Sequence, residues 1–250
     1  MTRELEGKVA LVTGAARNIG RAICVALAEA GANVVVNVKS SLELAAETAK
    51  LVEAAGAKAI VAPADVTDEA SVAKMLAAAK EAFGGVDILV NNAAVRKEAP
   101  FDSVTFAEWH QVLAIMLDGA FLCTKACVPS MRARGGGRVI TIGGLTGHSG
   151  AKQRIHVVTG KAGLAGFTKA IAQDLAADGI TANCVVPGMI DTERGAHAPQ
   201  APKHHAERPR LIEPLGKPSE IAALVRHLAG PQSRYITGQS IHINGGVFMP

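Results

Sequence analysis

The sequence predicts an α/β protein with a doubly wound parallel sheet of about seven strands and helices on both faces. Three observations support this. Short apolar runs alternate with segments of helical periodicity along the whole chain. The composition is 49% hydrophobic but only 3% aromatic, so small aliphatic side chains must fill the core. The 250 residues contain no Ser/Gly linker, low-complexity tract or internal repeat, which favours one domain over residues 1–250.

The predicted elements follow this alternation in order. Each strand is a short run rich in Val and Ile and bounded by turn residues. The strands fall within residues 8–13, 33–38, 57–66, 86–94, 137–144, 180–188 and 236–246. Each helix carries apolar residues at a spacing of three to four, and several end at a glycine. The helices cover residues 18–32, 41–56, 69–85, 106–131, 160–179 and 219–230.

Charge and composition argue against several classes of protein. The net charge of +4 comes from 26 basic and 22 acidic residues, and no basic cluster interleaves with aromatic residues, so nucleic-acid binding is not expected. There is no signal-peptide pattern and no apolar run of membrane-spanning length, so we expect a cytoplasmic protein without a membrane segment. The cysteines have apolar neighbours and lack metal-ligand spacing, which predicts reduced core residues and no metal site. They are Cys24, Cys123, Cys127 and Cys184.

The turn from the first strand into the first helix predicts a nucleotide site. It reads TGAARNIG, residues 13–20. Gly14 and Gly20 permit a tight turn and a close backbone approach to a pyrophosphate, and the helix N-terminus offers free N–H groups to the anion. Many α/β proteins use such a turn without binding a ligand, but its place in the first unit favours the functional interpretation.

Several motifs together resemble the short-chain dehydrogenase/reductase family, especially its bacterial ketoacyl-reductase-like members. They are TGAARNIG, with Asn18 at the family's middle glycine, Asp65-Val66, NNAA (91–94), PGMIDT (187–192) and YITGQSIHINGG (235–246). The resemblance covers nearly the whole chain and implies a Rossmann-type fold. It also implies that the loop holds the pyrophosphate and that four further segments line the cofactor. The residues implied are Gly14, Arg17, Asn18, Ile19 and Gly20 for the loop, Asp65 and Val66 at the adenine, Asn92 and Ala93 at the ribose, and Pro187, Gly188, Ile190 and Thr192 at the nicotinamide.

Charge predicts which nicotinamide nucleotide binds. Proteins that use NAD place a carboxylate near the end of the second strand to hold the ribose 2′-hydroxyl. Here residues 37–41 contain no carboxylate, and Arg17 and Lys39 are placed to flank a 2′-phosphate. The alternative is that both are solvated surface cations. We therefore predict NADP(H) in preference to NAD(H).

The catalytic positions depart from the family. The resemblance implies a serine, a tyrosine, a lysine and an asparagine. Lys161 matches the lysine, which in the family also binds the ribose. Val157, Gly144 and Met116 stand at the tyrosine, serine and asparagine positions. The single tyrosine, Tyr235, belongs to another matching segment, so the site lacks a phenol.

Two histidines are candidate substitutes for the missing proton donor. His156 adjoins the tyrosine position, although neighbouring residues on a helix point about 100° apart, so the alternative is a histidine on the outer or interface side. His148 follows the fifth strand at the carboxyl edge of the sheet, with an ordinary exposed loop histidine as its alternative. Residues 194–215 correspond to the family's mobile substrate lid.

These observations favour an enzyme over a binding protein. The leading hypothesis is an NADP(H)-dependent oxidoreductase that transfers hydride from NADPH to an activated C=O, C=N or C=C bond of a small molecule. The alternative is a catalytically inert nucleotide-binding subunit or scaffold, acting as partner of a homologous subunit. A cofactor-independent lyase ranks last, because the nucleotide loop is intact. The resemblance further implies a homodimer or homotetramer.

Overall fold

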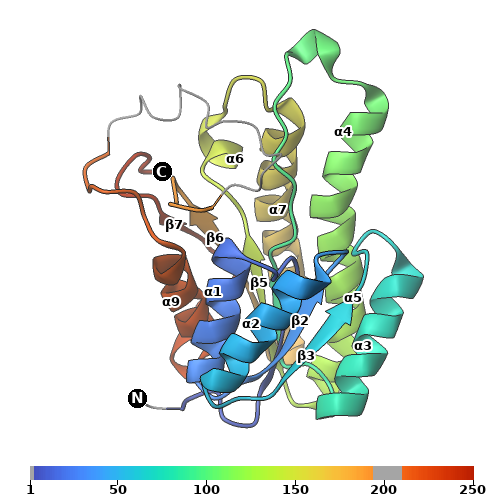
Figure 1. Cartoon of the computed structure of the whole chain (residues 1–250). Helices are drawn as coiled ribbons and strands as arrows, with labels where there is room; N and C mark the ends of the chain where they lie inside the picture. The colour runs from blue at the N-terminus through green and yellow to red at the C-terminus, as the bar shows by residue number, and fades with distance from the viewer. Residues whose placement is uncertain (1–2, 194–209) are drawn as a thin grey trace.

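The computed structural model describes residues 3–193 and 210–250. Within them, a seven-stranded sheet has the order β3-β2-β1-β4-β5-β6-β7, and every neighbouring pair is parallel. The number of strands and their direction confirm the predicted fold class (Figure 1). The strands are β1 (Val9–Val12), β2 (Asn33–Val38), β3 (Ala59–Pro63), β4 (Ile88–Asn91), β5 (Gly137–Ile142), β6 (Ile180–Pro187) and β7 (Ser240–Ile243).

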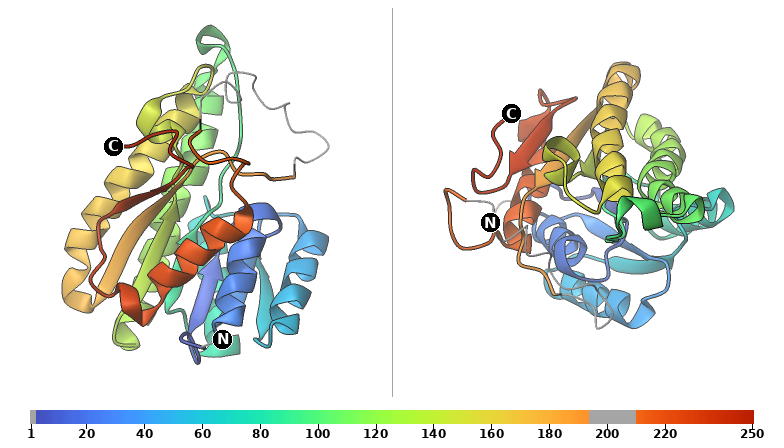
Figure 2. Two further views of the ribbon diagram at one scale, coloured as in Figure 1. Left: turned by 90° about the vertical axis from the view of Figure 1, so that its left-hand side faces the viewer. Right: turned by 90° about the horizontal axis from the view of Figure 1, so that it is seen from above.

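Helices cover both faces of the sheet, as Figures 1 and 2 show. One face packs against α1 (Asn18–Glu29), α2 (Leu42–Ala54) and α9 (Pro218–Ala229). The other packs against α3 (Glu69–Phe83), α5 (Gly119–Ala133) and α7 (Ile155–Asp174). Among the described residues, the other helical segments are α4 (Phe106–Leu113), the short α6 (Thr146–Ser149), a π-helical turn at Ala114–Asp118 and three 3₁₀ turns at Phe101–Ser103, Ala176–Asp178 and Pro231–Ser233.

Strand β1 illustrates why the strands read as continuous apolar runs. Ala10 and Val12 belong to the core beneath α1, whereas Val9 and Leu11 belong to the core beneath α5. All four side chains are at most 1% exposed. A strand covered on both faces has no polar side to alternate with, so its sequence is apolar throughout.

The long helix predicted over residues 106–131 is one helical stretch from Phe106 to Ala133, with a π-helical turn at Ala114–Asp118 between α4 and α5. By length and composition alone this stretch is sufficient to cross a membrane, which corrects the expectation that no apolar run reaches that length. Its apolar face lies in the core, where Cys123, Cys127 and Met131 are fully buried. Packing therefore accounts for part of the apolarity of the stretch.

Helix α7 begins at Ile155, five residues before the predicted start at residue 160. The added turn is rich in β-branched residues, which favour helix weakly, so local propensity did not indicate it. Packing supplies the stabilisation, because Val157 belongs to a buried cluster with Met116. As a result, Val157 and Lys161 lie one turn apart on the same helix.

Most of the predicted lid, 194–209, lies outside the described residues. The described remainder of the lid, 210–215, returns toward the C-terminal segment. Arg210 pairs with Glu213 at 2.7 Å, and the Leu211 N–H donates to the Gly245 carbonyl at 2.9 Å. The mobility of the lid remains a prediction.

Candidate active site

The loop between β1 and α1 makes its turn with two glycines that have no room for a side chain. Gly14 has a φ of +62°, and a Cβ there would lie 2.9 Å from the Cα of Ala93. A Cβ at Gly20 would lie 2.5 Å from the Gly14 carbonyl oxygen. Gly14 and Arg17 are exposed, so the start of α1 opens to solvent. This backbone can approach an anion closely, and the N-terminus of α1 favours negative charge.

Residues at the ends of β1 and β4 hold this loop in place. The Thr13 hydroxyl accepts the N–H groups of Asn92 and Ala93 at 2.9 and 3.0 Å. In return, the Asn92 side-chain amide donates to the Thr13 and Gly14 carbonyls at 2.9 and 3.0 Å. The NNAA motif therefore positions the loop between β1 and α1, a function that its spacing in the sequence did not reveal.

Asn18 connects the same loop to the segment after β6. Its side chain donates to the Glu193 carbonyl at 2.9 Å and accepts the Glu193 N–H at 3.0 Å. Its φ is +53°, a left-handed conformation that Asn tolerates better than most residues. Asn18 thus adopts a left-handed conformation and forms a link across the carboxyl edge of the sheet.

The predicted adenine end contains an ion pair that the sequence did not indicate. The Lys39 ammonium lies 2.6 Å from a carboxylate oxygen of Asp65. The hydrogen bond from Lys39, with a second from the Thr67 backbone, lowers the pKa of Asp65 to about 2. Lys39 is 72% exposed and Arg17 is also exposed. Both cations therefore remain accessible beside the loop, although Lys39 is already paired.

Lys161 lies where the ends of β5 and β6 meet α7. Its ammonium donates to the Ile142 carbonyl at the end of β5, at 2.7 Å. Burial lowers the pKa of Lys161 to about 8. The nearby charge of Arg96 lowers it too, and the Cys184 thiol acts in the opposite direction. A Cβ at Gly144 would lie 3.6 Å from the Lys161 side chain, which is ordinary contact. Lys161 is thus a protonated amine near neutral pH that releases its proton readily.

Val157 and Met116, at the predicted tyrosine and asparagine positions, lie together in an apolar cluster. Val157 and Met116 are 7% and 1% exposed and pack with Val112, Ala120 and Leu164. Met116 is part of the π-helical turn, a local irregularity frequently found at functional sites. The structure therefore brings Lys161, Gly144, Val157 and Met116, the positions predicted from the sequence, to one place.

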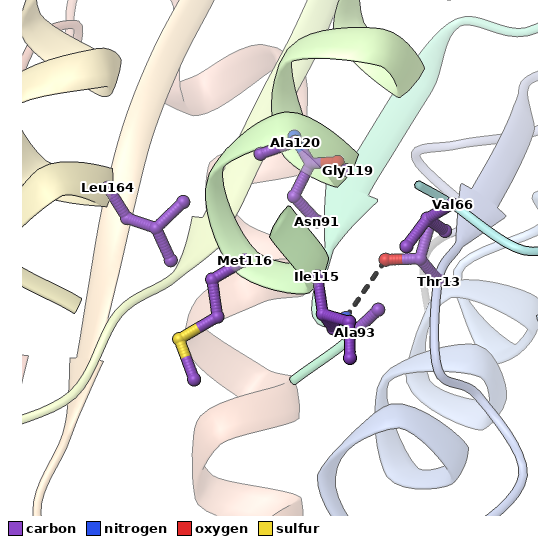
Figure 3. A pocket seen from close by; sticks show the side chains of 9 residues that line it. All are labelled: Thr13, Val66, Asn91, Ala93, Ile115, Met116, Gly119, Ala120 and Leu164. Atoms are coloured by element: carbon purple, nitrogen blue, oxygen red, sulfur yellow. Dashed lines mark hydrogen bonds between the residues drawn. The ribbon is translucent and has the colours of Figure 1, made fainter. Parts of the chain in front are cut away.

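A small cavity lies beside this cluster (Figure 3). It measures about 10 Å³, which is room for one water at most. Met116 and Leu164 border it on one side and Thr13 and Val66 on the other, so it separates the apolar cluster from the phosphate loop.

A larger cavity of about 270 Å³ opens at the start of α7, with Phe101, Arg154 and Val158 among its lining residues. It adjoins the turn of α7 that carries Val157. Its size is suitable for a small organic molecule.

The two candidate histidines differ in their surroundings. The His156 ring is fully buried, its Nδ1 accepts the Val157 N–H at 2.9 Å, and its Nε2 lies 3.5 Å from the Glu108 carboxylate on α4. His148 packs edge-on against His242, with ring centroids 4.6 Å apart. Burial, then the charge of Lys169, lowers the pKa of His148. Both histidines remain candidate proton donors. Lys161 is closer to the predicted catalytic positions, because it lies one turn from Val157 and within contact distance of Gly144.

The segment after β6 is fixed to its neighbours by backbone bonds. The Pro187 carbonyl accepts the Leu145 N–H at 2.9 Å, and a Cβ at Gly188 would lie 2.6 Å from the Cα of Asn244. Ile190 forms a parallel bridge with Gly216. This places the predicted nicotinamide segment beside the loop that contains Gly144.

Arg96 is a site residue that the sequence analysis missed. Both terminal nitrogens of its guanidinium donate to the Thr192 hydroxyl at 3.3 Å. The signal was a cation five residues beyond the end of β4, in a loop at the carboxyl edge of the sheet. It was overlooked because it matches no motif.

These features fit a nicotinamide nucleotide. The loop between β1 and α1 has a glycine cradle that a Cβ would fill and leads into a helix N-terminus, and the cations Arg17 and Lys39 nearby are exposed. The chain also places a half-buried lysine, Lys161, at the end of β5.

Comparisons with known proteins agree with this geometry. Residues 14–248 match the family model described as enoyl-(acyl carrier protein) reductase. The chain is 38% identical over 247 residues to a 3-oxoacyl-(acyl-carrier-protein) reductase of Vibrio cholerae, covering 98% of this chain and 99% of that protein. It is also 38% identical over 240 residues to nodulation protein G of Azospirillum brasilense, covering 96% and 98%.

Solved structures show the same similarity. A short-chain type dehydrogenase/reductase from Mycobacterium marinum superposes with a TM-score of 0.90 at 33% identity, covering 99% of this chain and 98% of that one. A double mutant of a Serratia marcescens short-chain dehydrogenase/reductase gives 0.88 at 36% identity, covering 98% and 99%.

Proposed function

Because the chain belongs to the short-chain dehydrogenase/reductase family of oxidoreductases, we propose that it is an NADP(H)-dependent reductase with an atypical active site. Its substrate is a small molecule with an activated C=O, C=N or C=C bond. The observation that carries this proposal is Lys161, held by the Ile142 carbonyl beside Gly144 and facing the end of the sheet where the nucleotide cradle lies. We further propose that it works in the cytoplasm as a homodimer or homotetramer.

The cofactor site is assigned to the residues predicted from the sequence. The loop of Gly14, Asn18 and Gly20 holds the pyrophosphate, and Arg17 and Lys39 hold the 2′-phosphate. The support is the glycine cradle and the exposure of both cations. A nicotinamide nucleotide bound there supplies the hydride.

Lys161 is the proposed proton donor. The Ile142 carbonyl holds its ammonium in one orientation, and the absence of a side chain at Gly144 leaves space above it. The apolar side chains of Val157 and Met116 exclude water, which strengthens the interaction between the ammonium and a developing negative charge. Nζ gives its proton to the substrate oxygen or nitrogen as the reduced product forms. A pKa of about 8 is well matched to this task near neutral pH.

This arrangement favours activated substrates. A general acid contributes roughly 10²–10⁴-fold to a rate, and a lysine alone replaces the family's usual group of polar residues. A cationic iminium accepts hydride without a proton, and an enone is reduced more readily than a simple ketone.

The proposal is tested by the pH dependence of kcat/KM with NADPH as reductant. We compare a ketone with an N-alkylated cyclic iminium between pH 6 and pH 10. Because the Lys161 pKa is about 8, the protonated fraction falls as the pH rises through 8. Ketone reduction should therefore fall about tenfold per pH unit above pH 8, whereas iminium reduction should not follow that fall.

Lys161→Met should reduce ketone turnover more than iminium turnover. Lys50→Met, at an exposed position on α2, is the control and should leave both unchanged. Absence of hydride transfer to any acceptor would overturn the proposed function in favour of an inert subunit. Parallel pH profiles for ketone and iminium would exclude Lys161 as the acid.

A further inference from the structure

One short segment crosses the carboxyl edge of the sheet and joins the two halves of the predicted cofactor site. Residues 188–193, which we call the strap, leave the end of β6 and reach the start of α1, where Glu193 pairs with Asn18. Strands β4 and β5 lie between β1 and β6 in the sheet, so the strap spans the ends of both. The predicted pyrophosphate loop therefore lies at the far end of the strap, and the strap itself contains the predicted nicotinamide residues that follow β6.

The two ends of the strap are held in different ways. Near β6, backbone hydrogen bonds hold it, from the Gly188 N–H to the Ile243 carbonyl at 2.9 Å and from the Asp191 N–H to the Gly216 carbonyl at 2.7 Å. At the far end, side chains of other loops hold it, among them Asn18. This far end therefore depends on single residues, which a substitution can remove without changing the strap itself.

Asn18 holds the strap through backbone groups alone. Its side-chain amide donates to the Glu193 carbonyl at 2.9 Å and accepts the Glu193 N–H at 3.0 Å, so the side chain at position 193 takes no part. Arg96 adds a second contact, at the Thr192 hydroxyl. Glu193 is exposed and Asn18 is half-buried, so water competes for both bonds of the Asn18 link.

This competition determines when the link is strong. In the cofactor-free protein, the end of the strap can separate from the loop at small cost, because water replaces the two bonds. A nucleotide that touches both the loop and the strap holds the two together, and the link then adds its bonds to the closed state. Resting on the proposed function, we propose that Asn18 is a positioning residue that fastens the strap to the phosphate loop and slows the release of a bound nicotinamide nucleotide.

Two other roles for the link would leave different kinetic signatures. A link that only stabilises the fold would change the free energy of unfolding and leave the release of nucleotide unchanged. A link that is equally closed in the free protein would slow entry and release alike, and its removal would leave the Kd unchanged. Separate measurement of the two rate constants distinguishes all three roles.

The test measures NADPH release by stopped-flow fluorescence, with excess NADP⁺ displacing NADPH from the protein. Asn18→Gly removes both bonds and accepts the left-handed φ of +53°. Asn18→Ala removes the same bonds and strains that φ. The matched control is Asn33→Gly, at the amino end of β2, because the Asn33 side chain also accepts a backbone N–H, that of Lys58 at 3.0 Å.

Asn18→Gly should raise the release rate constant about tenfold, the size expected for the loss of hydrogen bonds of this kind, and the association rate constant by less than about threefold. Asn18→Ala should release NADPH as fast as Asn18→Gly although it is less stable, and Asn33→Gly should match the wild type. An unchanged release rate in Asn18→Gly would overturn the inference. An equal rise in both rate constants, or a similar rise in Asn33→Gly, would overturn it too.

Hydrogen exchange at the Glu193 amide tests the link without turnover. In the protein saturated with NADPH this amide should be protected, and Asn18→Gly should speed its exchange about tenfold or more. Faster NADPH release from Asn18→Gly, in a protein that reduces no acceptor, would support the inference and contradict the proposed function. Normal turnover, with NADPH release and Glu193 exchange that Asn18→Gly leaves unchanged, would contradict the inference alone.

Discussion

Three positions, Gly144, Val157 and Met116, are predicted to differ from the family's usual catalytic residues, and their surroundings define the proposed chemistry of this site. A Cβ at Gly144 would lie 3.6 Å from the Lys161 side chain, which is an ordinary contact distance. The backbone at this position therefore accepts a larger residue. Val157 and Met116 fill the space with apolar atoms. The local surroundings of Lys161 are therefore less polar than a serine, a tyrosine and an asparagine would make them, which agrees with the lowered pKa of the lysine.

Restoring two of these side chains should restore ordinary carbonyl reduction. We predict that Gly144→Ser combined with Val157→Tyr raises kcat/KM for a neutral ketone by about 10²-fold or more, since a phenol acid and a hydroxyl donor return. The flexible Met116 thioether can adjust to the larger ring.

The matched control is Gly144→Ser with Val157→Phe, which adds the same ring without the hydroxyl. This control variant should show no gain in kcat/KM for the neutral ketone. If the tyrosine and phenylalanine variants bind NADPH normally and reduce the ketone equally slowly, the assignment of Val157 to the tyrosine position is wrong.

Individual elements meet at the carboxyl edge through a few polar side chains. Thr13 and Asn92 join β1 to β4, and Asn18 joins the start of α1 to Glu193 after β6. The glycines allow these close approaches, because a Cβ at Gly20 would also meet the Asn92 amide at 2.8 Å. The site is therefore positioned by links between elements as well as by the sheet.

The Asn18 link gives a test at this scale. Asn18→Ala should lower the free energy of unfolding by about 2 kcal/mol, because it loses two hydrogen bonds and retains a left-handed φ that costs alanine about 1 kcal/mol. Asn18→Gly loses the bonds but accepts the φ of +53°, so it should lower stability by only about 1 kcal/mol.

Urea unfolding of both variants measures the difference, and NADPH titration measures the effect on the loop. Equal destabilisation by alanine and glycine would show that backbone conformation at this position contributes nothing. An unchanged NADPH affinity in both would show that the link does not position the phosphate loop.

Over the whole molecule, the fold could be predicted because its main signal is repetitive. Residues 33–38 form β2 with the predicted bounds, and the other strands lie within their predicted segments. Runs of Val and Ile that are buried on both faces, separated by helical periods, have few interpretations other than a parallel sheet. The glycines of the phosphate loop also have a strong local signal, since their role is set by backbone conformation.

The features that were missed depend on contacts between distant segments. The pair of Lys39 with Asp65, the bridge from Arg96 to Thr192 and the link from Asn18 to Glu193 each join loops that follow different strands. No local pattern encodes such partners. The early start of α7 was missed for a related reason, because tertiary packing of Val157 outweighs the weak helix propensity of its neighbours.

The central claim is that the carboxyl edge of this sheet binds NADPH in preference to NADH, and a parallel fluorescence titration with both nucleotides tests it most directly. We predict that NADPH binds at least about tenfold more tightly, because Arg17 and Lys39 add charged hydrogen bonds to the 2′-phosphate. Arg17→Gln should reduce this preference and leave NADH binding unchanged. Equal affinities for the two nucleotides would contradict the assignment of the cations, and the absence of binding by either nucleotide would contradict the reductase itself.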